Sequence, residues 1–402
     1  MKTSPPGSYF FLVLPYGMSA GFVNVTLPFV LTQAGFSVAA AASIVAVGIS
    51  ANIWRFLWGP VADLTLTLRG WYLIGVVACA GALLGLSLMP LRPSVVAVLT
   101  ATVFLSQVAA TLVVLPVGGM MAHTVDDARK GRAAGWFQAG NLGGMFGGGG
   151  AGVWLAHHFS LAVAGTTLAA VMVLCAGALA LVPDVRPEAG ATLGSRLGDI
   201  GRDFLELVRS PIALLVVAVV SSPIGAGAAS SLWSAVATDW RAGADTVALV
   251  TGVLSGVVST LGCVFGGWIS DRVGRWWSFF GAGVVMAATT LVMAIAPRTP
   301  VAYDAGVLLY ALWTGWSYAA FSALLLYVVR RGAASTKYAT LSSLGNLPTT
   351  YMTAFDGWAH DRYGAGGMLN AEAVLGLGSV TLGLAALGVI SHGGLRHRRH
   401  GN

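Results

Sequence analysis

The sequence predicts an all-α integral membrane protein with twelve transmembrane helices, arranged as two pseudo-symmetric halves of six. Three observations predict this fold: the composition, the length of the apolar runs and an internal repeat. Hydrophobic residues occupy 56% of the 402 positions and charged residues only 9%, an imbalance that no water-soluble domain of this length can bury. The apolar runs are continuous and long enough to cross a bilayer as helices, whereas a membrane β-barrel needs alternating segments of about ten residues.

The predicted helices follow one another along the chain with short polar links between them. We expect them at about residues 9–32, 37–62, 70–90, 94–118, 133–157, 160–183, 211–238, 246–270, 276–297, 301–329, 337–359 and 367–391. Each run matches the roughly 20 apolar residues that a membrane-spanning helix needs. The links leave no room for a soluble catalytic domain, so we do not expect an enzyme.

The longest polar interval, residues 184–210, divides the chain into its two halves. We expect an N-terminal half at residues 1–183 and a C-terminal half at residues 211–402, which ends in a basic cytoplasmic tail. Within the interval, apolar residues recur at helical spacing and charged residues fill the other positions. This pattern predicts a cytoplasmic linker with a short amphipathic helix on the membrane surface.

The distribution of Lys and Arg predicts the orientation of the chain. If the N-terminus is cytoplasmic, only Arg92, Arg241, Arg298 and Arg362 fall on the opposite side, and Arg55 lies within the second helix. The positive-inside rule therefore places both termini in the cytoplasm. We expect a multi-pass protein of a bacterial inner (cytoplasmic) membrane. The net charge of +7 follows from this topology and does not indicate a nucleic-acid partner.

A G-x-x-x-D motif occurs at the ends of the second and eighth predicted helices, 208 positions apart (271 minus 63). An Asp at a helix C-terminus is unfavourable unless a positive group such as the N-terminus of another helix approaches it. We therefore expect a pair of cytoplasmic gating contacts, with an ordinary solvated loop Asp as the alternative. The motif residues are Gly59 and Asp63 in the first copy, and Gly267, Asp271, Arg272 and Arg275 in the second.

A second repeat places Asn141 in the fifth helix and Asn346 in the eleventh, 205 positions apart (346 minus 141). A carboxamide inside a membrane helix must find a hydrogen-bond partner, because lipid offers none. At equivalent points of the two halves, these side chains would face each other or a shared cavity. The alternative is that each bonds a neighbouring backbone carbonyl.

These motifs resemble those of the major facilitator superfamily. Residues 266–275, GGWISDRVGR, are similar to its signature loop, while in the first copy Leu64 stands where the family usually has Arg. A narrower resemblance links RFLWGPVAD (55–63) and KYATLSSL (337–344) to the subgroup of the AmpG-type muropeptide permease and acetyl-coenzyme A transporters. In this chain Arg55 replaces the usual Lys, and the eleventh helix lacks a Gln. The resemblance implies a secondary transporter.

Arg55 lies eight residues before Asp63, too deep in a helix for an idle charge. It could bind an anionic group of the substrate, or it could snorkel or pair with an acid such as Asp63 or Asp356. Other polar and aromatic residues could line the same cavity, although membrane aromatics are more often packing residues. The candidate substrate-binding residues are Asn24, Arg55, Gln107, Gln138, Asn141, Trp316, Tyr318 and Asn346.

Three acids are the candidates for proton coupling. Asp356, Asp304 and Glu372 lie in the outer halves of the last helices, where a partly buried carboxyl group can load and release a proton. Interfacial anchoring is the alternative for each, and it is favoured for Asp304 and Glu372, which are near helix N-termini. Asp356 is the sharpest candidate, because its equivalent position in the first half is Ala151.

The sequence contains no H-E-x-x-H, Walker lysine motif or C-x-x-C, so we expect no catalytic site, no metal and no cofactor. We predict a monomeric secondary active transporter that moves a small polar or anionic solute by alternating access, with proton-coupled import. The alternatives are a drug or metabolite exporter and a non-transporting membrane sensor or assembly partner.

Overall fold

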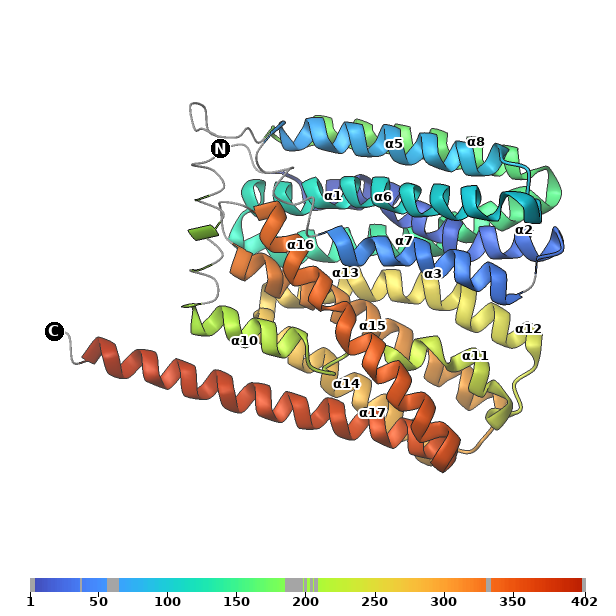
Figure 1. Cartoon of the computed structure of the whole chain (residues 1–402). Helices are drawn as coiled ribbons and strands as arrows, with labels where there is room; N and C mark the ends of the chain where they lie inside the picture. The colour runs from blue at the N-terminus through green and yellow to red at the C-terminus, as the bar shows by residue number, and fades with distance from the viewer. Residues whose placement is uncertain are drawn as a thin grey trace. The chain divides into compact units, whose positions relative to one another are not determined.

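The computed structural model describes residues 4–36, 38–55, 65–184, 209–329 and 334–399, together with residues 198, 201, 202 and 205. These residues contain helices and no strand, as the composition predicts (Figure 1). The contacts divide the chain into two compact units. Unit 1 comprises Met1–Ile200 and Val329–Ser343, and unit 2 comprises Gly201–Val328 and Leu344–Asn402.

Unit 1 contains the helices of the first half and one short segment from the second. Helices α5 and α8 run side by side in it, and α7 packs along α1 (Figure 1). The helices are α1 (Ser8–Gly21), α2 (Leu27–Gln33), α3 (Val38–Trp54), α5 (Leu68–Leu88), α6 (Val96–Thr124), α7 (Lys130–His158), α8 (Leu161–Cys175) and α16 (Ala334–Leu344). A π-helical turn, η1 (Phe22–Thr26), joins α1 to α2. Short segments of 3₁₀-helix, which are common at helix ends, are η3 (Pro93–Val95), η4 (Asp127–Arg129) and η5 (Ala176–Leu181).

Glycines allow α1 and α7 to touch backbone to backbone. A β-carbon at Gly21 would lie 2.1 Å from the carbonyl oxygen of Met145. One at Gly140 would lie 2.3 Å from the carbonyl oxygen of Phe10. Side chains cannot fit at such distances, so the dense glycine run of α7 serves the close helix packing that is typical of membrane bundles.

This packing predicts opposite effects for two glycines of α7. A β-carbon at Gly144 would lie 2.8 Å from the carbonyl oxygen of Leu14, whereas Gly147 has nothing within 4 Å. We expect Gly144→Ala to force α1 away and lower stability by about 1–3 kcal/mol. Gly147→Ala should leave stability unchanged or raise it by up to about 1 kcal/mol, because Ala favours helix. Thermal unfolding of the two purified variants checks this, and equal shifts would contradict it.

Unit 2 contains the helices of the second half, several of them interrupted. They are α10 (Pro211–Val220), α11 (Trp233–Val236), α12 (Ala244–Val247), α13 (Ser255–Val273), α14 (Arg275–Ile295), α15 (Pro300–Val329) and α17 (Asn346–Arg399). Short 3₁₀ turns η6 (Ala228–Ser231) and η7 (Ala237–Trp240) flank α11, and a π-helical segment η8 (Ala248–Leu254) precedes α13.

The seventh predicted helix is broken, whereas the sequence predicted one continuous helix at 211–238. Helix α10 ends at Val220, and the chain then runs through Gly225 and Gly227, whose φ angles of 59° and 69° suit glycine. Pro223 lies in the same segment and cannot donate a backbone hydrogen bond. The sequence pattern missed the break because no charged residue interrupts the run 211–238.

Hydroxyl groups of α15 and α17 bind the carbonyl oxygens that the break exposes. Ser317 of α15 donates to the Gly225 oxygen at 2.9 Å. From α17, Thr349 donates to Ala226 at 2.9 Å, Tyr351 to Ser221 at 3.0 Å and Thr353 to Ala228 at 3.4 Å. Because membrane-embedded carbonyl groups need such partners, α17 holds the broken segment in place.

Helix α17 consists of two arms. Gly364 has φ 68° and ψ −172°, and the chain folds back there (Figure 1). The arms correspond to the outer part of the eleventh predicted helix and to the twelfth. By length and composition, eight helices in the described part of the chain can cross a membrane, and α17 with the end of α16 counts as one of them. The total of twelve spans and the two halves of six remain predictions.

The predicted amphipathic helix of the linker lies outside the described residues, apart from a few single positions.

Candidate functional site

Arg55 lies immediately after α3 and is 8% exposed. Its Nη2 donates to Ser342 Oγ at 2.7 Å and its Nε to Ser343 Oγ at 3.1 Å. Both serines belong to α16, which is part of unit 1. Among the described residues no carboxylate forms an ion pair with Arg55, and Asp63 lies outside them. A guanidinium has five N–H donors, so Arg55 holds a buried positive charge with donors left over.

The polar residues near Arg55 come from three helices of unit 1. Tyr16 of α1 donates from its hydroxyl to Asn52 Oδ1 at 2.9 Å, and Asn52 lies one turn before Arg55. Gln107 of α6 donates from Nε2 to Ser19 Oγ at 3.1 Å, one turn after Tyr16. We call Arg55, Ser342, Ser343, Tyr16 and Asn52 the Arg55 site. Of these, only Arg55 was a candidate from the sequence.

Other predicted substrate residues of unit 1 lie in α1–α2 and α7. Asn24 is in the π-helical turn, and its Oδ1 is buried without a hydrogen-bond partner. Asn141 Nδ2 donates to Gln138 Oε1 at 3.0 Å, within α7. The partner of Asn141 is thus a side chain one turn away. A π-helical turn inside an α-helix is often found at a functional site. Asn24, which lies in such a turn, therefore stays a candidate for substrate binding.

In unit 2, two of the three predicted acids lie close to each other. Asp356 belongs to the first arm of α17 and Glu372 to the second, and the Glu372 carboxyl group acts electrostatically on Asp356. Tyr310 of α15 donates a hydrogen bond from its hydroxyl to Glu372 Oε1. We call Asp356, Glu372 and Tyr310 the carboxyl cluster. Asp304, the third acid, lies in α15 with its Oδ1 buried and without a partner.

The carboxyl cluster is buried. Asp356 is 0% exposed and Glu372 6% exposed. In the described part of the chain, neither oxygen of Asp356 has a hydrogen-bond partner, and neither does Glu372 Oε2. No Lys or Arg forms an ion pair with either acid among the described residues. The sequence favoured an interfacial anchor for Glu372, near a helix N-terminus, but its side chain points into the unit and reaches Tyr310, 62 positions away.

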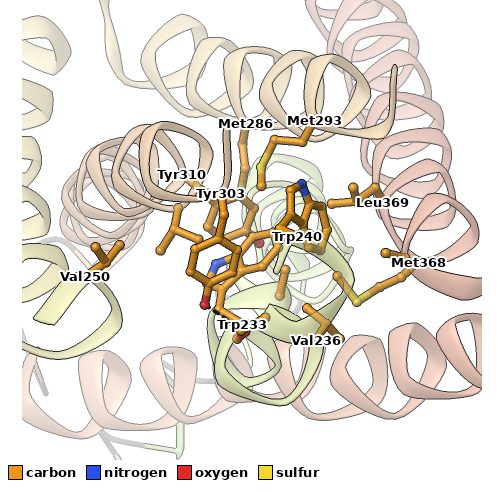
Figure 2. Close-up of a cluster of buried hydrophobic side chains, with 14 residues drawn as sticks. Trp233, Val236, Trp240, Val250, Met286, Met293, Tyr303, Tyr310, Met368 and Leu369 are labelled. Carbon is orange, nitrogen blue, oxygen red and sulfur yellow. Dashed lines mark hydrogen bonds between the residues drawn. The ribbon is translucent and has the colours of Figure 1, made fainter. Parts of the chain in front are cut away.

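Aromatic and sulfur-containing side chains pack around Tyr310 of the carboxyl cluster. Trp233 packs edge-to-face on Tyr310 with ring centroids 5.3 Å apart (Figure 2). Tyr303 donates from its hydroxyl to the Trp233 carbonyl oxygen at 2.8 Å, and Met286 and Met293 belong to the same buried cluster as Tyr310 (Figure 2). A carboxyl group in such an apolar environment favours its neutral form, and two adjacent carboxylates disfavour double ionisation. The arrangement can therefore bind a proton.

The remaining candidates of unit 2 are on α13, α14, α15 and α17. Trp316 donates from Nε1 to Ser278 Oγ at 2.8 Å, Tyr318 is half-buried, and Asn346 is exposed at the first position of α17. In the signature loop, Gly267 is buried. Asp271 is near the end of α13, Arg272 lies over the Trp268 ring at 4.3 Å and Arg275 over the Tyr327 ring at 5.2 Å. Gly59 and Asp63 of the first copy lie outside the described residues.

Sequence reasoning missed Ser342, Ser343, Tyr16, Asn52 and Tyr310. All five are ordinary helix residues in the sequence, and their importance comes from partners in other helices. The two adjacent serines of KYATLSSL gave the only signal, through the narrower family resemblance.

Comparisons with known proteins identify the fold. The model of the Major Facilitator Superfamily matches residues 9–350. Among similar crystal structures, the human organic anion transporter MFSD10 (TETRAN) has a TM-score of 0.68 at 14% identity and covers 94% of this chain and 98% of its own. The E. coli fucose:proton symporter FucP has a TM-score of 0.70 at 13% identity, and the match covers 95% of this chain and 98% of FucP. The proton:xylose symporter XylE, bound to 6-bromo-6-deoxy-D-glucose, has a TM-score of 0.68 at 15% identity, and the match covers 94% of this chain and 93% of XylE.

No curated protein sequence matches the chain. The family and the three structures are membrane transporters and not enzymes. The predicted fold class is confirmed, and the narrower subgroup stays a prediction.

Proposed function

Because the chain belongs to the major facilitator superfamily, we propose that it is a secondary active transporter that imports a small polar or anionic solute together with a proton. The solute and the proton bind at different places, the Arg55 site in unit 1 and the carboxyl cluster in unit 2. Alternating access exposes them to one side of the membrane and then to the other.

The observation that carries the proposal is the carboxyl cluster. Asp356 is fully buried and neither of its oxygens has a partner. Burying an ionised carboxylate without a cation is strongly unfavourable, so a proton is the simplest species that makes this position stable. Acids inside membrane segments mark proton or ion pathways by default. FucP and XylE, which share the fold, are described as proton symporters.

The buried Arg55 supports an anionic solute. Its contacts to Ser342 and Ser343 are to neutral hydroxyls, and no carboxylate of the described residues compensates its charge. Arg is the side chain best suited to bind carboxylate or phosphate through two parallel hydrogen bonds. MFSD10, which shares the fold, is described as an organic anion transporter. The narrower resemblance suggests a sugar–peptide fragment or an acyl conjugate as cargo.

The remaining parts of the proposal concern the membrane context. We place the protein in a bacterial inner membrane as a monomer with both termini in the cytoplasm. The two G-x-x-x-D copies, with Gly59, Asp63, Gly267 and Asp271, act as cytoplasmic gating contacts with the help of Arg272 and Arg275.

Uptake into proteoliposomes tests the function. The purified protein is reconstituted, a pH gradient that is acidic outside is imposed, and labelled organic anions, sugars, sugar–peptide fragments and acyl-coenzyme A are offered in turn. We expect one of them to accumulate inside and an uncoupler to abolish the accumulation. Expulsion of preloaded solute when the gradient is imposed would instead identify an exporter. Absence of flux with every probe would support the non-transporting alternative.

A further inference from the structure

The first arm of α17 carries a stripe of polar residues that follows the broken seventh helix. Thr349, Thr353, Asp356 and His360 are spaced by four, three and four residues, the spacing that places side chains on one helix face. The two threonines bond the carbonyl oxygens of Ala226 and Ala228, as described above. We call these four residues the α17 stripe.

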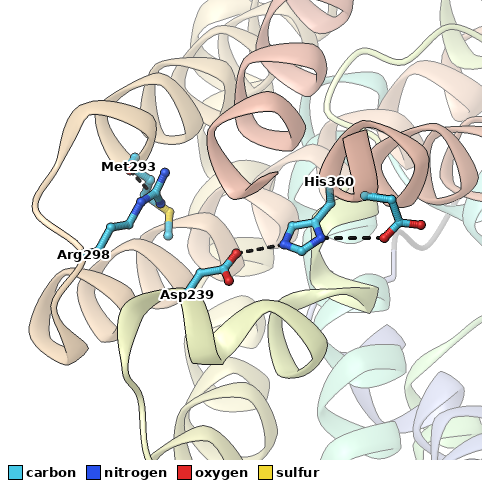
Figure 3. Close-up of polar contacts among 5 residues, drawn as sticks. Asp239, Met293, Arg298 and His360 are labelled. Atoms are coloured by element: carbon cyan, nitrogen blue, oxygen red, sulfur yellow. Dashed lines mark hydrogen bonds and ion pairs between the residues drawn. The ribbon is translucent and has the colours of Figure 1, made fainter. Parts of the chain in front are cut away.

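His360 ends the α17 stripe and is bound to the seventh helix region. Its Nε2 lies 2.8 Å from Oδ2 of Asp239, a residue of η7 (Figure 3). Its Nδ1 lies 4.0 Å from Asp361 Oδ1. The side chains of His360 and Asp239 are 27% and 35% exposed, so water reaches the imidazole. Asp356, one turn earlier on the stripe, is 0% exposed.

The spacing places the exposed imidazole next to the buried carboxyl group. Four residues correspond to about 6 Å along a helix axis, and helical side chains lean towards the N-terminus of their helix. Both side chains lean the same way, so the imidazole follows the carboxyl group by one turn on the same face of α17, a separation that a bridging water can span. An imidazole that exchanges protons near neutral pH is the usual shuttle between water and a buried acid.

We propose that His360, oriented by Asp239, is the group that passes protons between outer water and Asp356. The neutral imidazole accepts a proton at Nδ1 and becomes imidazolium. It then donates a proton through a bridging water to a carboxylate oxygen of Asp356, which becomes the neutral acid, and the imidazole is neutral again. Asp239 accepts the Nε2–H hydrogen bond throughout. The inference rests on the proposed proton coupling and gives the carboxyl cluster its entry path.

Charged groups from three parts of unit 2 are relevant to proton transfer between His360 and Asp356. Within α17 they are Asp356, Asp361 and Arg362. Asp239 lies in η7, and Arg241 directly follows it. The turn between α14 and α15 supplies Arg298, whose guanidinium lies 4.2 Å from the centre of the Trp240 ring and donates to the Met293 carbonyl oxygen at 3.5 Å (Figure 3).

Proton access can be measured on the purified protein without any solute. The protein is transferred from H₂O to D₂O buffer, and infrared difference spectra follow the isotope shift of its protonated carboxyl bands, assigned with Asp356→Asn and Glu372→Gln. We expect His360→Gln to slow the exchange of the Asp356 band at least about tenfold, in line with the loss of a positioned proton-transfer group. Asp239→Asn should slow it less, because the imidazole is kept but loses its orienting carboxylate.

A matched control and a rescue separate proton transfer from a structural role. His158 is an exposed histidine of α7 whose Nδ1 lies 2.9 Å from the Trp154 oxygen, and His158→Gln should leave the exchange unchanged. Added imidazole should restore the exchange in His360→Ala. Wild-type exchange in His360→Gln, or slow exchange that imidazole does not relieve, would overturn the relay. Such a result would leave solute uptake untouched, whereas failure of the uptake assay would overturn the proposed function itself.

Discussion

Arg55→Gln is expected to reduce kcat/KM for the anionic solute by about ten- to a hundredfold, the loss that corresponds to one charge-assisted hydrogen-bonded contact. The glutamine can still bond Ser342 and Ser343, so the link between the end of α3 and α16 is kept while the charge is removed. Arg55→Lys keeps the charge but loses the planar guanidinium group, so its kcat/KM should lie between those of the wild type and Arg55→Gln. Initial uptake rates over a range of solute concentrations measure the effect.

The control for Arg55 is Arg92→Gln, since Arg92 is an exposed arginine of the same unit. It should transport like the wild type. A neutral analogue of the solute should be transported equally well by the wild type and by Arg55→Gln. If Arg55→Gln reduced transport of the neutral and the anionic compound to the same extent, Arg55 would have a structural role and the proposal of an anion site would be contradicted.

Glu372→Gln and Asp356→Asn are expected to abolish proton-driven accumulation while leaving solute exchange across the membrane intact. Both changes mimic the protonated acid and keep its shape, so the variants should still alternate with solute bound but no longer require a proton. For one proton per solute, a pH gradient of one unit drives about tenfold accumulation. We expect the variants to reach only equal concentrations on the two sides.

Two assays on one preparation separate these effects: uptake driven by a pH gradient, and exchange of labelled for unlabelled solute without a gradient. Asp126→Asn changes an exposed acid and should leave both assays unchanged. Accumulation at the wild-type level in both Asp356→Asn and Glu372→Gln would show that the carboxyl cluster does not couple transport to protons. Tyr310→Phe removes the donor to Glu372 Oε1 and should alter the pH dependence of accumulation while exchange persists.

The helices were predictable because they follow from composition alone. An apolar run of sufficient length must be helical in a membrane, whatever its neighbours are. The break after Val220 was not predictable in this way, since Ser317, Thr349 and Thr353 make it stable from positions about 90 or more residues away. Tertiary hydrogen bonds of this kind leave no periodic pattern in the broken segment itself.

The candidate site was predictable only in part, and for a similar reason. Arg55 and Asp356 stood out because a charge within an apolar run is unusual wherever it occurs. Glu372 was harder to interpret, because its position near a helix start has the same sequence appearance whether the side chain faces water or Tyr310. Nothing in the sequence singled out His360. Its position one turn from Asp356 and its contact with Asp239 are seen only in the structure.

The most direct test of proton-coupled transport is the pH of a lightly buffered suspension of proteoliposomes when the transported solute is added. The account predicts that the medium becomes more alkaline as solute and protons enter together. It predicts no pH change for a preparation that carries both Asp356→Asn and Glu372→Gln, although that preparation still exchanges solute. Solute entry without alkalinisation in the wild type, or equal alkalinisation in the double variant, would contradict it.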